Sequence, residues 1–171
     1  MNRRQWIASG TVAALLLAGI GTLYELQPDR APTDDYHFRN LSEEDRGILA
    51  SLAPVMLAGS LPANNDSALR ALIEGFDIAV AGLTPSVQAE VAQLMMLLRV
   101  APLRMAATGV MKPWHLASHD EIARFLTGWR YSSIAKLRSA YDALHQLCYG
   151  AWYGNTMSWA GTSYPGPPKI A

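Results

Sequence analysis

The sequence has a single cysteine, Cys148, among its 171 residues. One thiol excludes an intrachain disulfide framework and every zinc site that is built from several cysteines. Charged residues are also scarce, at 16% of the chain, and basic and acidic side chains balance at 14 each. With aromatics at 9%, this balance gives no general basic footprint for nucleic acid, so we expect no nucleic-acid partner.

Motifs for cofactors are missing as well. The sequence has no Cys-x-x-Cys-His for haem attachment and no Glu-x-x-His of the kind that builds di-iron sites. A Gly-x-Gly-x-x-Gly turn would need a preceding strand, and the chain has no strand pattern. We therefore expect no catalytic, cofactor-binding or metal-binding residues in this chain, and we predict that it is not an enzyme.

What the chain does have is hydrophobic residues, which make up 50% of it. That share argues against a disordered chain, and the length suits one domain. Residues 5–23 carry no charge and follow the pair Arg3 and Arg4. A positive segment before an apolar one is typical of a secretory leader.

The paired arginines make this leader resemble the bacterial twin-arginine signal, which a receptor reads and which carries folded proteins. We interpret residues 1–26 as this signal and predict a periplasmic protein that meets the twin-arginine translocase. The expected signal residues are Arg3, Arg4, Trp6 and Ile7.

An uncleaved membrane anchor is the alternative for the same segment. A bilayer span needs ~20 apolar residues, and residues 5–23 are just long enough. Arg3 and Arg4 would then stay in the cytoplasm. No clean Ala-x-Ala cleavage site follows the apolar segment, so association with the inner membrane stays open. In both cases the rest of the chain lies outside the cytoplasm.

The remainder divides into three parts. Residues 27–41 are polar and contain two prolines, which predicts a linker. Residues 42–154 carry apolar side chains at helical spacing, which predicts a helical domain. Residues 155–171 are rich in glycine and proline and predict an irregular tail. The expected fold is all-α, a bundle of about five helices after an N-terminal signal or anchor helix.

Local signals place the helix ends. Ser42 is the expected N-cap of the first helix, and Pro54 should kink or end it near Ala53. Thr84 and Pro85 open a later helix. Ser118 and Glu121 form a capping box. The longest helix is expected from about Ser132 to about Tyr153, with an apolar face formed by Ile134, Leu137, Tyr141, Leu144, Cys148 and Ala151.

Two pairs of side chains, one of two histidines and one of a histidine and the cysteine, are candidate reactive sites. His115 and His119 are four residues apart, a spacing that suits a metal on one helix face, but a helix that starts at Ser118 leaves His115 outside. His145 and Cys148 lack an identifiable third group that would orient a nucleophile and its base. A polar helix entrance and a buried, inert cysteine are the interpretations we favour.

Aromatic residues gather in the last third of the chain, where nine of the fifteen lie between Phe125 and Tyr164. Several fall at or beyond the end of the longest helix, among glycines and prolines that cannot form a core of their own. Trp and Tyr are typical anchors of protein interfaces, and a stiff proline-rich end loses little entropy on docking. The expected partner contacts are Trp129, Trp152, Tyr153, Trp159, Tyr164, Pro165, Gly166, Pro167 and Pro168.

The same third carries a family resemblance. Residues 125–130 (Phe-Leu-Thr-Gly-Trp-Arg), 151–155 (Ala-Trp-Tyr-Gly-Asn) and 161–168 are similar to the small subunits encoded beside periplasmic flavin dehydrogenases. These include the small subunits of sorbitol and fructose dehydrogenases and, more distantly, gluconate 2-dehydrogenase subunit 3. The chain departs from the family at Ser163, where the family has glycine before the Tyr-Pro-Gly run.

The resemblance implies a non-catalytic accessory subunit. It would escort and stabilise an FAD-dependent large subunit of the glucose–methanol–choline class, which lacks an export signal of its own, and a cytochrome subunit often completes such complexes. FAD is then expected in the partner and not in this chain. The alternatives are an independent exported helical enzyme that uses the histidines above, and a membrane-tethered binding module.

Overall fold

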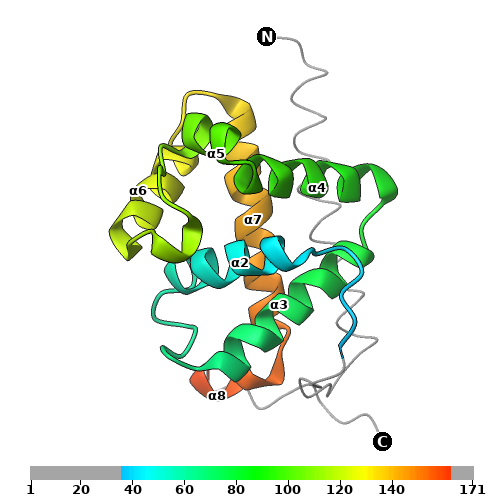
Figure 1. Cartoon of the computed structure of the whole chain (residues 1–171). Helices are drawn as coiled ribbons and strands as arrows, with labels where there is room; N and C mark the ends of the chain where they lie inside the picture. The colour runs from blue at the N-terminus through cyan, green and yellow to red at the C-terminus, as the bar shows by residue number, and fades with distance from the viewer. Residues whose placement is uncertain (1–35, 163–171) are drawn as a thin grey trace, which may run out of the picture.

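The computed structural model describes residues 36–162, and all regular elements in that range are helical, as the sequence predicts (Figure 1). The signal predicted at residues 1–26 lies outside the described residues, as does the end of the tail from residue 163. In chain order the elements are α2 (Glu43–Met56), α3 (Asp66–Ala81), α4 (Pro85–Arg99), α5 (Ala101–Thr108), the 3₁₀ turn η1 (Trp114–Leu116), α6 (His119–Arg130), α7 (Ala135–Tyr153), the 3₁₀ turn η2 (Thr156–Ser158) and α8 (Trp159–Thr162).

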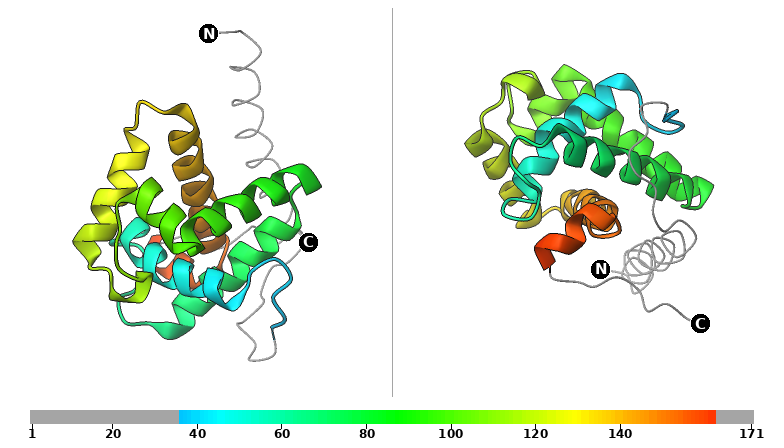
Figure 2. Two further views of the ribbon diagram at one scale, coloured as in Figure 1. Left: turned by 45° about the horizontal axis from the view of Figure 1, so that its top comes forward. Right: turned by 90° about the horizontal axis from the view of Figure 1, so that it is seen from below.

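Helix α7 runs through the middle of the molecule, with α2 and α3 crossing it and α6 alongside (Figure 1). Seen along its axis, α7 lies directly beside α3 (Figure 2). A glycine lets these two helices approach closely. A Cβ built on Gly75 of α3 would lie 3.1 Å from the carbonyl oxygen of Ala151 in α7. Only glycine fits at this crossing without a shift of one helix.

The core forms along this crossing and continues under α2 and α6. Its largest fully buried side chains include Trp152, Phe76 and Leu147, none more than 1% exposed. The same cluster contains Cys148 and extends to Phe125 and Trp129 of α6. Because burial of apolar surface is the main favourable term in folding, this continuous core accounts for a single packed unit.

Several helix ends follow the sequence signals. Ser118 caps α6 with the predicted capping box: its Oγ accepts from the Glu121 N–H, and the Glu121 carboxylate accepts from the Ser118 N–H at 2.8 Å. Ser42 caps α2 in the same way, with Asp45 as its partner. Pro85 is the first residue of α4, as expected for a proline whose missing N–H has no helical partner there.

The predicted break at Pro54 is wrong by a few residues. Helix α2 continues through Pro54 to Met56 and contains the proline in its last turn. A proline that close to the end removes only one backbone hydrogen bond. The next N–H donors are satisfied again, since Leu57 donates to the carbonyl of Ala53 at 2.9 Å.

Helix α7 differs from its prediction at the start. It begins at Ala135, and Ile134 is its N-cap with 57% of its surface exposed, so Ile134 does not belong to the buried face. Leu137 and Tyr141 are half-buried. The remaining members of the predicted face, Leu144, Cys148 and Ala151, are buried as expected.

The end of the predicted linker is packed onto the domain. Asp77, in the middle of α3, is fully buried and its carboxylate accepts four hydrogen bonds from the segment before α2. The donors are the Tyr36 hydroxyl at 2.8 Å and the backbone N–H groups of Arg39 at 3.1 Å, Asn40 at 2.8 Å and Leu41 at 3.1 Å. Burial, and the hydrogen bond to Asp77, raise the pKa of Tyr36 above its ordinary value. Residues 36–41 are therefore part of the folded unit.

The predicted irregular tail also begins with regular structure. Asn155 caps η2 by accepting from the Met157 N–H at 2.9 Å, and α8 follows from Trp159 to Thr162. Ser158 is buried and its hydroxyl donates to the carbonyl of Asn155 at 2.8 Å. The chain after α7 is thus folded back against the domain for at least these two turns.

Candidate functional site

The aromatic side chains predicted to contact a partner fall into different environments. Trp129 and Trp152 are 3% and 1% exposed, so both rings belong to the core, and of the two only Trp129 lines the groove described below. Tyr153 is 39% exposed, and its hydroxyl lies 2.8 Å from Oγ of Ser60. Trp159 is half-buried in α8. The remaining predicted contacts lie outside the described residues: Tyr164, Pro165, Gly166, Pro167 and Pro168.

The two tryptophans are buried for a reason that sequence spacing does not reveal. Trp152 lies in the last turn of α7, one residue from the close crossing with α3, where no solvent reaches it. Trp129 donates from its indole Nε1 to the carbonyl of Ala107 at 2.8 Å, which satisfies its polar atom inside the protein. The burial of Trp152 speaks against its predicted contact with a partner, whereas Trp129 could be reached only through the groove that it lines.

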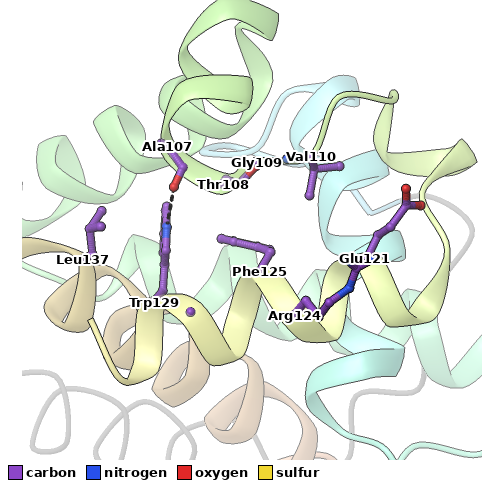
Figure 3. A pocket seen from close by; sticks show the side chains of 10 residues that line it. Ala107, Thr108, Gly109, Val110, Glu121, Arg124, Phe125, Trp129 and Leu137 are labelled. Atoms are coloured by element: carbon purple, nitrogen blue, oxygen red, sulfur yellow. Dashed lines mark hydrogen bonds between the residues drawn. The ribbon is translucent and has the colours of Figure 1, made fainter. Parts of the chain in front are cut away.

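A groove opens on the outer side of Trp129, between α5, α6 and the start of α7 (Figure 3). Its volume is about 450 Å³. Phe125 and Trp129 project from α6 toward the end of α5, and Leu137 of α7 lies on the far side of the indole (Figure 3). The full lining is Ala107, Thr108, Gly109, Val110, Glu121, Arg124, Phe125, Gly128, Trp129 and Leu137.

The wall opposite α6 is fixed by the way α5 ends. Gly109 is the C-cap of α5 in the left-handed conformation, with φ of 73°, which an L side chain rarely adopts. The hydroxyl of Thr108 donates to the Arg104 carbonyl at 2.8 Å and accepts from the Val110 N–H at 3.1 Å. These bonds turn the chain sharply, so that residues 108–110 form a rigid rim.

Beneath this rim lies a packed aromatic layer. The ring of Phe125 meets Trp129 edge-on at 4.8 Å and Trp114 at 5.5 Å between centroids. Arg104 is 7% exposed, lies over the Trp114 ring and donates to the Val110 carbonyl at 3.4 Å. Buried aromatic pairs of this kind hold their geometry, so the floor of the groove is preformed.

Gly128 lines the groove and has no side chain to fill it. It lies inside α6, where glycine is about 1 kcal/mol less favourable than alanine. A Cβ at this position would meet no atom of the chain within 4 Å. Gly75 is explained by the helix that touches it, but no contact of that kind within residues 36–162 explains Gly128.

Four exposed hydrophobic residues lie within four positions of residues that line the groove. Met111 follows Val110 and is 72% exposed, and Tyr131 follows Gly128 by three residues with the same exposure. Ile134, one turn before Leu137, is 57% exposed, and Leu103, one turn before Ala107, is 42% exposed. Such a cluster around a concave site is typical of an interaction surface.

The charges of the molecule are divided between two regions. Residues 101–138, which contain the groove, carry six basic and two acidic side chains, a net charge of +4. Residues 36–100 carry four basic and seven acidic side chains, a net charge of −3. Within the groove region one acid is already neutralised, because Lys112 lies 3.2 Å from the Glu121 carboxylate.

The histidine and cysteine candidates lie in η1, at the start of α6 and on α7. Across residues 36–162, no group of three or more His, Cys, Asp and Glu side chains is placed to hold a metal ion. His115 lies in η1, before the helix that begins at His119, as the capping box predicts. Cys148 is fully buried, and burial raises the pKa of its thiol to about 12. Its neighbour His145 stacks on Tyr149 at 4.1 Å between ring centroids.

Burial, together with the positive charge of Arg130, lowers the pKa of His145 below its ordinary value, so its ring is neutral at about pH 7. The stack continues to Tyr141 on one side and from Tyr149 to Tyr153 on the other. Tyr149 donates to the Met56 carbonyl at 3.2 Å, which ties this row of rings to α2. The row therefore serves packing between α7 and α2.

Comparisons with known proteins add no relative: no family model matches the sequence, and neither a curated protein nor a solved structure matches it significantly. A search for membrane spans gave one finding. Within residues 36–162 no single helix has the length and apolarity of a span, and only α4 and α5 taken together, bent by 93°, reach them.

Sequence reasoning did not find the groove. Gly128 and Trp129 lie in a segment that carries the family resemblance, but the sequence did not predict that they line a groove. A signal was present in Gly128, a glycine within a capped amphipathic helix. The opposing rim at residues 108–110 gave no signal, because its distance from α6 depends on long-range packing.

Proposed function

We propose that this chain is a non-catalytic accessory subunit that escorts a folded FAD-dependent dehydrogenase through twin-arginine export and stabilises it. The observation that carries the proposal is the pair Arg3 and Arg4 before the uncharged residues 5–23, a leader that serves folded cargo. The catalytic chemistry would belong to the FAD of the partner, a flavoprotein of the glucose–methanol–choline class. A cytochrome subunit would complete the complex.

The helical domain supports this proposal by its chemistry. Its one thiol, Cys148, is buried and unpaired with another cysteine, which suits folding in the reducing cytoplasm before export. It carries a groove with an apolar floor in a segment with more basic than acidic residues, a surface suited to a partner protein. An escort needs these two properties, a fold completed early and a surface that holds cargo.

Export of the partner tests the proposal. In a bacterium that produces both proteins, replacing Arg3 and Arg4 with lysine should strand this chain and its flavoprotein together in the cytoplasm. The matched control is Arg39→Lys with Arg70→Lys, which makes the same chemical change at two arginines of the domain that do not line the groove. Flavin-dependent dehydrogenase activity in the periplasmic fraction is the readout.

The proposal predicts that this activity disappears from the periplasm in the leader variant and stays in the control. Continued export of the flavoprotein by the leader variant would disprove the escort role. A stoichiometric metal found in the purified chain, lost on replacing His115 and His119 with alanine, would favour the independent enzyme instead.

A further inference from the structure

The groove between α5, α6 and α7 is suited to bind an apolar side chain of another protein segment. Its floor is apolar, formed by Val110, Phe125 and Trp129, each less than 5% exposed and held by the packing beneath. A preformed apolar floor favours an inserted apolar side chain, since no reorganisation is needed on binding.

The charge near the groove favours a bound segment with acidic residues next to the inserted apolar side chain. Residues 101–138 have a net charge of +4, and the groove lining holds Arg124 together with Glu121, whose carboxylate is already paired with Lys112. Arg130 lies 5.4 Å from the centre of the Tyr131 ring, and Arg138 donates to the Ser132 carbonyl, so both cations are held beside the α6–α7 turn. Complementary charge speeds association and excludes like-charged partners.

Gly128 adds an argument about distance. A glycine within a helix leaves room for another backbone, as Gly75 does for Ala151. Gly47 of α2 is as open as Gly128, but of the two only Gly128 lines the groove. At Gly128 the space above the backbone is open and faces the groove. A chain that docks there can approach the α6 backbone more closely than over any other residue of the helix's outer face.

We propose that this groove binds an acidic protein segment whose apolar side chain enters between Thr108 and Gly128 while a carboxylate beside it meets Arg124. The proposal rests on the proposed function in one respect, that the segment belongs to the escorted partner. The surrounding residues Leu103, Met111, Tyr131 and Ile134 form the apolar border of the contact.

Concavity favours a protein segment over a lipid surface. The site is a groove of about 450 Å³ that takes a protruding side chain, whereas a bilayer offers a broad, flat plane. Complementary charge sets the chemistry of the segment, because a basic surround selects an acidic flank.

The test uses the full chain and two substitutions that block the site in different ways. Gly128→Trp fills the groove, and its matched control is Gly47→Trp, at another glycine inside a helix over open space. Arg124→Glu reverses the charge of the lining, and its control is Arg39→Glu, an exposed arginine of the acidic region. Circular dichroism and urea unfolding identify any variant that fails to fold.

Binding is measured by fluorescence anisotropy with a short labelled peptide in which Leu and Phe alternate with Asp and Glu. A second peptide replaces every acid with Lys, and vesicles of phosphatidylglycerol serve as the membrane probe. We expect the acidic peptide to bind, the basic peptide not to bind, and Gly128→Trp and Arg124→Glu each to weaken binding by roughly tenfold or more. Both controls should bind as the wild type does.

Four results would overturn the proposal. The first is peptide binding that Gly128→Trp leaves unchanged, and the second is vesicle binding that depends on the groove while the peptide does not bind. The third is self-association of the chain that Gly128→Trp abolishes. The fourth is peptide binding that appears only after deletion of residues 163–171. The last two would assign the groove to a second copy or to the chain's own end.

Co-purification separates this proposal from the proposed function. If a flavoprotein co-purifies with the wild type and equally with Gly128→Trp, the groove is not its binding site and the escort role stands. If no flavoprotein co-purifies with the wild type, the escort role fails, and the peptide measurement still decides whether the groove binds an acidic segment.

Discussion

Gly75 and Gly128 are both glycines within long helices, and they mark two regions of opposite character. At Gly75 the backbone of α7 is so close that a methyl group would meet the Ala151 carbonyl at 3.1 Å. At Gly128 a methyl group would meet nothing. The first region is a finished contact that holds the domain together. The second is a surface left open by the chain's own packing.

The two regions also differ in charge and in how their polar groups are used. Residues 36–100 are acidic, and their most buried acid, Asp77, is saturated by four hydrogen bonds from within the chain. The groove region is basic, and Arg124 reaches an exposed edge of it. The hydrogen-bonded carboxylate of Asp77 stabilises the fold, whereas an exposed cation such as Arg124 beside an apolar floor is available for binding.

Thiol reactivity should give the largest difference between the regions. Cys148 is buried in the core on α7, the helix that contacts α3 at Gly75, and the pKa of its thiol is raised to about 12. A thiol reagent at about pH 8 should therefore label it only when the domain opens. A cysteine introduced at Gly128, in a Cys148→Ser background, should react like a free thiol. We expect labelling rates that differ by ~10³-fold or more, because opening of a core costs several kcal/mol.

Labelling followed by mass measurement checks this, with denatured protein as the reference for both sites. Comparable native rates at the two positions would show that the α3–α7 contact is not closed in solution.

The next largest effect is expected at Asp77. Asp77→Ala leaves the donors of residues 36–41 without their acceptor, and each buried unsatisfied donor costs ~1–3 kcal/mol. The bond from Leu41 is buried and the other three are partly buried, so we expect a loss of roughly 2–4 kcal/mol in the free energy of unfolding by urea. Asp77→Asn keeps one acceptor oxygen and should lose less, which keeps the comparison measurable if the alanine variant does not fold.

Asp66→Ala is the matched control, because Asp66 is an exposed acid in the first turn of the same helix. Its loss should stay below ~1 kcal/mol, the usual size of a helix-dipole interaction. Equal losses at the two aspartates would contradict the role of Asp77 in holding residues 36–41.

Alanine at the two glycines should change stability in opposite directions. Gly75→Ala forces α3 and α7 apart, and overpacking of this kind costs ~1–3 kcal/mol. Gly128→Ala removes an unfavourable helix residue without a clash and should add up to ~1 kcal/mol. Thermal unfolding of the two variants measures both. A stabilising Gly75→Ala or a strongly destabilising Gly128→Ala would refute the contrast on which the two regions are defined.

The smallest effect is a pH dependence at the capping box. The backbone N–H of Ser118, then the Lys112 ammonium, lower the pKa of the Glu121 carboxyl from 4.5 to about 2. A lowered folded pKa stabilises the protein fully above the unfolded value, and this contribution is lost as pH falls from about 4.5 toward 2. Between about pH 4.5 and 2, the urea midpoint of Glu121→Gln should depend less on pH than that of the wild type. Above about pH 4.5 the two pH dependences should be the same.

The matched control for this prediction is Glu43→Gln, an exposed acid in the first turn of α2. A carboxyl titration by NMR that places Glu121 near its ordinary pKa would contradict the capping geometry.

The fold could be anticipated from local signals far better than the groove. The capping box of Ser118 and Glu121 lies within one helical turn, and Pro85 marks a helix start by itself. Such helix starts can therefore be predicted from residue type and spacing alone. Pro54 was misplaced because a proline in the last turn loses little, and spacing alone does not say how many turns remain.

Long-range contacts explain what sequence reasoning missed. Asp77 stands on an otherwise apolar helix, and its partners lie 36 to 41 residues earlier, where no periodic pattern points to them. Trp129 and Trp152 looked like surplus aromatics beside glycines, yet the core absorbs both rings. The groove exists only where α5, α6 and α7 meet, so it could be recognised only after they were packed.

Hydrogen–deuterium exchange tests the central claim, that the groove region meets the partner and the acidic region does not. The full chain is compared alone and co-purified with its partner. The account predicts slower exchange in the complex within residues 101–138 and unchanged exchange in α2 and α3. Protection confined to α2 and α3, with residues 101–138 unchanged, would contradict it.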